Sequence, residues 1–219
     1  YDQAIESYRK ALEIKPESAA AHYNIGVAFK ANSKFKLAIE SFIEAIKLKP
    51  DYAEAHINLG NTYQERGDTK AAVQSYNWAI KYKPELPESY YNLANVLEDQ
   101  KKLDLAIVNY KKVIAINPDH ADAYNNLGNC LQKQGQLDLA SENYQKAIMI
   151  DCNHVTAYYN LGNIWNAKRQ FDRAISYYKK TLEYKFNHFD SYLNLGNVWR
   201  QKGEYETAIV NYLEALKIK

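Results

Sequence analysis

Apolar residues recur at helical spacing along the chain, in a pattern that appears twice in every block of 34 residues. In one block Ala55, Leu59 and Tyr63 share one helical face, and Ala72 and Tyr76 share the next. Residues three or four positions apart line one side of a helix. The pattern therefore predicts two amphipathic helices per block, packed as an antiparallel pair.

The period of 34 residues is marked most clearly by glycine. One position of the first helix holds glycine at intervals of 34 or twice 34 residues, and Ala94 fills the remaining place: Gly26, Gly60, Gly128, Gly162 and Gly196. A fixed period of this kind predicts a repeat architecture. Because one helix pair cannot bury its own apolar face, neighbouring pairs must stack into a solenoid.

The second helix of each block carries an alanine column and, four residues later, an aromatic column. The alanines are Ala4, Ala38, Ala72, Ala106, Ala140, Ala174 and Ala208. The aromatic residues are Tyr8, Phe42, Tyr76, Tyr110, Tyr144, Tyr178 and Tyr212. Small residues let two helix backbones approach, and we expect the aromatic rings to fill the space beside them.

Glycine and proline mark the turns. Gly67, Gly135 and Gly203 fall between the two helices of a block, where a left-handed cap residue is favoured. Proline closes the second helix of the early blocks, because it disfavours helical geometry in the preceding residue. We therefore expect a single array over 1–219, cut from a longer one. It consists of a half repeat, 1–18, and then repeats 19–52, 53–86, 87–120, 121–154, 155–188 and 189–219.

The motif of a single block resembles the tetratricopeptide repeat (TPR). It reads His22-x2-Ile25-Gly26-x2-Phe29, then Ala38-x3-Phe42, then Pro50. The resemblance covers the whole chain. It implies an all-α TPR solenoid of stacked antiparallel helix pairs that forms a right-handed superhelix, with the first helices lining its concave groove.

Composition and charge exclude several classes of function. The chain has 28 basic and 26 acidic residues, a net charge of +2 that gives no footprint for nucleic acid. No apolar run approaches the roughly 20 residues of a membrane-spanning helix, so we expect no membrane insertion. Cys130 and Cys152, the two cysteines, fit a reducing compartment. We therefore expect an intracellular, cytoplasmic location.

The sequence offers no catalytic, cofactor or metal site. All eight glycines serve the helix crossings or turns, which leaves none for a phosphate-binding loop. Two histidines share one repeat position and three share another, but equivalent residues of stacked repeats lie roughly 8–10 Å apart. Zinc ligands lie about 2.0–2.1 Å from one ion. We interpret His22 and His56 as packing residues and His120, His154 and His188 as loop residues.

Two columns of asparagine are the remaining feature of the first helices. One column holds Asn24, Asn58, Asn92, Asn126, Asn160 and Asn194. The other lies three residues later on the same face and holds Asn61, Asn95, Asn129, Asn163 and Asn197, with Val27 in its first place. Asparagine costs up to about 0.7 kcal/mol relative to alanine inside a helix, so compensating hydrogen bonds are expected.

A ladder of carboxamides suits an extended polypeptide, because an amide can pair with both the C=O and the N–H of a peptide group. Tyr91 and Tyr159, together with Tyr23, stand beside the ladder and are expected to contact the ligand. The alternative interpretation is that the asparagines tie one repeat to the next. Both interpretations remain open for both columns.

These features predict a noncatalytic scaffold that binds extended protein or peptide segments in its groove. The repeated NLGN resembles the TPR superhelix of O-GlcNAc transferases, and also microbial TPR scaffolds and consensus designs. The resemblance implies, as an alternative, a substrate-recruiting region of a larger glycosyltransferase. End-to-end self-association is a third possibility, because Ile209 and Leu213 would be exposed on the last helix.

Overall fold

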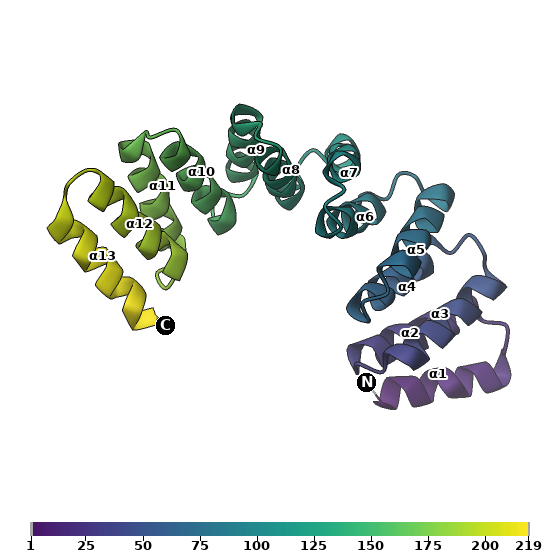
Figure 1. The fold of residues 1–219 in the computed structure, drawn as a ribbon. Coiled ribbons are helices and arrows are strands. Elements are labelled where there is room, and N and C mark those ends of the chain that lie inside the picture. The colour runs from purple at the N-terminus through teal and green to yellow at the C-terminus, as the bar shows by residue number, and fades with distance from the viewer. Residues whose placement is uncertain (1, 219) are drawn as a thin grey trace. The chain divides into compact units, whose positions relative to one another are not determined.

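The structure is a computed structural model that describes residues 2–218, over which thirteen helices and no strand are found. The chain divides into two compact units, residues 1–118 and 119–219, and each is described by itself (Figure 1). The helices of unit 1 are α1 (Asp2–Ile14), α2 (Ala19–Ala31), α3 (Phe35–Leu48), α4 (Ala53–Glu65), α5 (Thr69–Tyr82), α6 (Pro87–Asp99) and α7 (Leu103–Ile116). Those of unit 2 are α8 (Ala121–Lys133), α9 (Leu137–Ile150), α10 (Val155–Ala167), α11 (Phe171–Tyr184), α12 (Phe189–Gln201) and α13 (Tyr205–Ile218).

Within each unit the helices pack as sequential pairs, and the second helix of one pair packs against the first helix of the next. α2 pairs with α3, α4 with α5 and α6 with α7, while α1 packs on α2. In unit 2 the pairs are α8 with α9, α10 with α11 and α12 with α13. The predicted all-α fold of stacked helix pairs is confirmed.

The core of each pair is the crossing of a glycine with an aromatic ring. Tyr76, Tyr110, Tyr144 and Tyr178 are fully buried, and so is Phe42. A Cβ atom added to Gly60 would lie 2.5 Å from Cε1 of the Tyr76 ring. The ring thus occupies the space that a larger residue would need, as the two columns predict.

The turns inside the pairs use left-handed backbone. Gly67 has a φ of +81° and Gly135 has +77°, as expected for glycine after a helix. The other repeats place a residue with a side chain there, for example Lys101 with a φ of +61°. The turn geometry is therefore kept even where glycine is missing.

Three histidines cap helices in unit 2. The Nδ1 atoms of His120, His154 and His188 each accept the backbone N–H three residues later, at 3.3, 3.3 and 3.2 Å. They are N-cap residues of α8, α10 and α12 rather than plain loop residues. His56 instead packs as an aromatic residue, stacked on Tyr82 with ring centroids 5.6 Å apart.

Acidification should weaken the fold through His56 and His188. Burial is the main cause that lowers the pKa of both imidazoles below the usual value of 6.5. The unfolded chain therefore binds more protons than the folded chain below about pH 6.5, and stability falls as the pH falls through that value. We expect a lower urea midpoint at pH 5.5 than at pH 7.5, and a smaller difference for His188→Ser, which keeps a capping oxygen. Equal midpoints at the two pH values would contradict this assignment.

Candidate functional site: the asparagine groove

The second asparagine column is held by the buried tyrosine hydroxyls of the same repeat. Tyr76 donates to Asn61 Oδ1 at 2.7 Å, and Tyr144 donates to Asn129 Oδ1 at 2.9 Å. The same contact recurs for Asn95, Asn163 and Asn197 with Tyr110, Tyr178 and Tyr212, at 2.7, 2.8 and 2.9 Å. Burial raises the pKa of Tyr76 above its usual value, so its hydroxyl stays a proton donor. Each ring thus fixes the orientation of one carboxamide.

The first column reaches back to the preceding repeat. Asn92 Nδ2 donates to Asn61 Oδ1 at 3.0 Å, and Asn160 Nδ2 donates to Asn129 Oδ1 at 2.9 Å. Asn194 makes the same bond to Asn163 at 3.1 Å. We call each such pair of carboxamides an amide tie. The structure therefore contains the ties between repeats that the sequence left as an alternative.

Tyrosines and one further asparagine complete these ties. Asn58 Nδ2 donates to the Tyr23 hydroxyl at 3.0 Å, and Asn194 Nδ2 donates to the Tyr159 hydroxyl at 3.2 Å. The Tyr91 ring packs edge-on against Tyr110, with centroids 6.0 Å apart. In unit 2, Asn125 takes the tyrosine position, where it accepts from Asn160 at 3.3 Å and donates to Asn126 at 3.1 Å.

Asn24 differs from the rest of its column. Over the described residues its carboxamide has no hydrogen-bond partner, and its side chain is half-buried. Its repeat has Val27 in the second column and Phe42 in the aromatic column, so it lacks both the amide and the hydroxyl of a tie. Amide and hydroxyl are thus lost together, because a buried hydroxyl needs a partner.

Each amide tie leaves one acceptor and one donor unused. Within the described residues, Oδ1 of Asn92 and Nδ2 of Asn61 have no partner, and neither is among the buried atoms that lack a hydrogen bond. The same holds for Oδ1 of Asn160 and Nδ2 of Asn129. A peptide group needs one donor for its C=O and one acceptor for its N–H. A tie therefore still offers both.

In unit 1 such a tie opens into a hollow of about 490 Å³ lined by Lys30, Asn61, Gln64, Glu65 and Asn92. Its charges balance, since Lys30 Nζ lies 3.2 Å from Glu65 Oε1. Glu54 near the start of α4 is also paired, with Lys83 Nζ at 2.6 Å. The hydrogen bond to Lys83 is the main cause that lowers the pKa of Glu54. The groove of unit 1 is therefore polar but locally close to neutral.

Over residues 2–218 no group of three or more metal-ligating side chains comes together. No described helix is long and apolar enough to cross a bilayer. Cys130 is buried and Cys152 is exposed.

The tyrosine hydroxyls, Asn125 and the glutamine or glutamate after each tie were missed by sequence reasoning. Gln64 and Glu98, for example, lie 3.0 and 2.8 Å from the Tyr76 and Tyr110 hydroxyls. The signal that could have revealed the tyrosine partnership is the shared exception at Val27 and Phe42. The rings had been interpreted only as packing residues.

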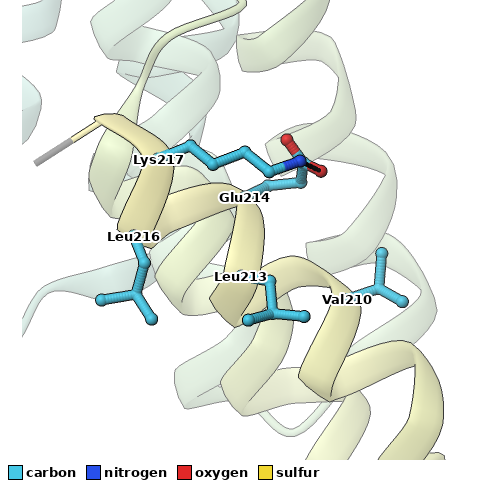
Figure 2. Close-up of a pocket in the computed structure, with 5 residues that line it drawn as sticks. All are labelled: Val210, Leu213, Glu214, Leu216 and Lys217. Carbon is cyan, nitrogen blue, oxygen red and sulfur yellow. Dashed lines mark hydrogen bonds and ion pairs between the residues drawn. The ribbon is translucent and has the colours of Figure 1, made fainter.

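The last helix exposes an apolar face. Val210, Leu213 and Leu216 lie along one side of α13, with 57%, 53% and 69% of their surface exposed (Figure 2). Ile209 is 56% exposed, whereas its equivalent Ile175 is only 6% exposed because the next repeat covers it. The predicted exposure of Ile209 and Leu213 is confirmed.

Comparison with known families and structures agrees with this architecture. The family described as "TPR repeat" matches residues 1–33, 30–67, 60–101 and 99–135, and "Tetratricopeptide repeat" matches 121–151 and 159–219. No curated protein sequence matches the chain.

Several solved structures share the fold. A crystal structure of MamA is 26% identical, with a TM-score of 0.69, and the match covers 73% of this chain and 94% of that one. YrrB, described as a TPR protein with an unusual peptide-binding site, is 24% identical, with a TM-score of 0.72 and coverage of 85% and 96%. PilF of Pseudomonas aeruginosa is 17% identical, with a TM-score of 0.79 and coverage of 99% and 92%.

Proposed function

The chain belongs to the tetratricopeptide repeat family, and we propose that it is a noncatalytic interaction scaffold whose asparagine groove binds an extended polypeptide through the peptide's main chain. The observation that carries the proposal is the unused donor and acceptor at each amide tie. In unit 1 this pair faces a polar hollow rather than the protein interior. The fold is compatible with such a role, since YrrB is described as having a peptide-binding site.

The geometry sets the expected length of the ligand. Unit 1 contains three first helices, and neighbouring packed helices lie roughly 8–10 Å apart. Three helices therefore span about 16–20 Å, which an extended chain crosses in about six residues at about 3.3 Å each. Because main-chain groups are bound, we expect broad selectivity among uncharged or mildly basic sequences of this length.

Two asparagine variants should separate binding from folding. We expect Asn24→Ala and Asn92→Ala each to weaken binding of a neutral octapeptide, N-acetylated Ser-Thr-Ala-Val-Ser-Thr-Ala-Val amide, by about two- to tenfold, the effect of one hydrogen bond. Only Asn92→Ala should also lower stability, because Asn24 has no hydrogen bond to lose. Isothermal titration calorimetry and urea unfolding measure the two effects.

Asn143→Ala is the matched control, since this side chain bonds to Leu139 O on the second helix α9, outside the groove. Its affinity for the octapeptide should equal that of the unaltered protein. If Asn24→Ala also bound the octapeptide with unaltered affinity, the groove would lose its proposed role at that end.

A second candidate is that the groove recruits substrates for a glycosyltransferase domain in the complete gene product. The amide columns favour it, because they resemble those of O-GlcNAc transferases. Self-association through the apolar face of α13 is a separate proposal, which concentration-dependent light scattering distinguishes from peptide binding. Both leave the main-chain recognition unchanged.

A further inference from the structure

A second hollow of unit 1 shares no residue with the asparagine groove. It has a volume of about 310 Å³ and lies between the second helices α3 and α5, with α4 contributing His56, Leu59 and Tyr63. Its walls include Ile43 and Ile46 from α3, and they are lined on the other side by Ala71, Gln74, Ser75 and Trp78 from α5. We call it the Trp78 hollow.

Three repeat positions depart from the rest of the array at this one place. The position of Ile43 otherwise holds Arg9, Asn77, Lys111, Gln145, Lys179 and Leu213. The position of Trp78 otherwise holds Lys10, Glu44, Lys112, Lys146, Lys180 and Glu214. The position of Ala71 otherwise holds larger residues, Gln3, Leu37, Leu105, Leu139, Arg173 and Thr207.

These departures act in the same direction. Ile43 and Trp78 make two walls apolar where charged or polar residues are usual, and Ala71 removes side-chain volume between them. Stacking of the repeats does not require any of the three, because the other repeats stack without them. Their coincidence in one hollow points to a ligand rather than to packing.

Trp78 remains accessible even though it has aromatic neighbours. Its ring stacks on Tyr82 and His56, with centroids 5.8 and 6.3 Å apart, yet 45% of its surface is exposed. A large exposed aromatic side chain beside a pocket is typical of the residues that anchor protein interfaces. The pre-stacked ring would also lose little conformational freedom on binding.

The rim of the hollow carries an uncompensated positive charge. Lys81 Nζ lies 4.4 Å above the Trp78 ring and, over the described residues, has no carboxylate partner. The other rim lysine, Lys47, is already paired with Glu44 at 2.5 Å. A carboxylate beside the hollow would therefore meet Lys81.

We propose that the Trp78 hollow is a second docking site, which takes one large apolar side chain of a partner protein whose next residue is acidic. The apolar side chain lies between Ile43 and Trp78 in the space left by Ala71, and the carboxylate pairs with Lys81. This site does not depend on the asparagine groove. The scaffold could thus hold one partner along its groove and another between its second helices.

The indole N–H signals of the protein give a direct test by NMR. The chain has three tryptophans, and comparison with Trp78→Phe assigns the signal of Trp78. The probe is the acetylated peptide amide Gly-Phe-Glu-Gly, compared with Gly-Phe-Lys-Gly and Gly-Ser-Glu-Gly. We expect the Trp78 signal alone to shift, with affinity for the first peptide at least about fivefold higher than for the other two, which is about 1 kcal/mol.

Two variants locate the site. Ala71→Leu installs the residue found at Leu105 and Leu139 and should lower the affinity for Gly-Phe-Glu-Gly at least about tenfold by filling the hollow. Lys81→Ala should remove the preference for Glu over Lys but keep the preference for Phe over Ser. Gln145→Ala, an exposed position on α9, should change neither.

Two results would overturn the proposal. One is a Trp78 signal that stays in place up to about 10 mM peptide, a concentration that would saturate even a millimolar site. The other is unaltered binding by Ala71→Leu in a protein whose thermal unfolding matches that of the unaltered chain. Neither result would affect the proposed groove, which is tested with a different probe.

Discussion

Tyr144→Ala lowers the free energy of unfolding by about 3–5 kcal/mol, the cost of truncating a fully buried aromatic side chain. The Tyr144 ring is completely buried and fills the space over Gly128, where a Cβ atom would lie 2.6 Å from its Cε1. Its hydroxyl also donates to Asn129. The variant therefore opens a cavity and releases one carboxamide of an amide tie. Urea unfolding followed by circular dichroism measures the loss.

Tyr144→Phe separates the ring from the hydroxyl. It keeps the packing and removes only the hydrogen bond, so we expect a loss of about 0.5–1.5 kcal/mol. Phe42 occupies the same position in the first full repeat, which shows that the fold accepts a ring without a hydroxyl. Equal losses for the two variants would mean that the ring contributes little, contrary to its burial.

Gly162→Val is expected to destabilise unit 2 by about 1–3 kcal/mol or more, as overpacked cores do. A Cβ atom at Gly162 would lie 2.5 Å from Cε1 of Tyr178, far inside van der Waals contact. The Tyr178 ring is fully buried and hydrogen-bonded to Asn163, so it cannot swing aside. A lower thermal midpoint is the expected result.

Gly162→Ala is the matched control for this prediction. Ala94 occupies the equivalent position in another repeat, where it is fully buried, so a single methyl group can be accommodated. Alanine also favours helix over glycine by about 1 kcal/mol, which offsets part of the crowding. We expect a much smaller change than for valine. A valine variant as stable as the unaltered protein would contradict the close approach of these helices.

The helix pairs and the left-handed turns could be predicted from the sequence, because they depend on local spacing and on backbone preferences. The positions of Gly60 and Tyr76 already indicate a close crossing that the structure contains. Which atom of a carboxamide is occupied could not be predicted, since it depends on rotamers set by neighbours in space. Asn61 shows this, because its Oδ1 serves both Tyr76 and Asn92 while its Nδ2 is left over.

The sequence also concealed the Trp78 hollow, for a related reason. Ile43, Ala71 and Trp78 are far apart in the chain, and each alone is an ordinary substitution. Only the packing of α3 beside α5 over α4 places them around one space. Exceptions to a repeat pattern become informative once the structure shows that they meet.

Backbone recognition by the amide ties is the central claim, and one NMR titration tests it most directly. The Ser-Thr-Ala-Val octapeptide and an analogue with the same side chains but N-methylated backbone amides are added to protein labelled with ¹⁵N in its asparagine side chains. We predict that the Nδ2 signals of Asn61 shift with the octapeptide and that the analogue binds much more weakly. Equal binding of both peptides, or binding without any movement of the Asn61 Nδ2 signals, would contradict the claim.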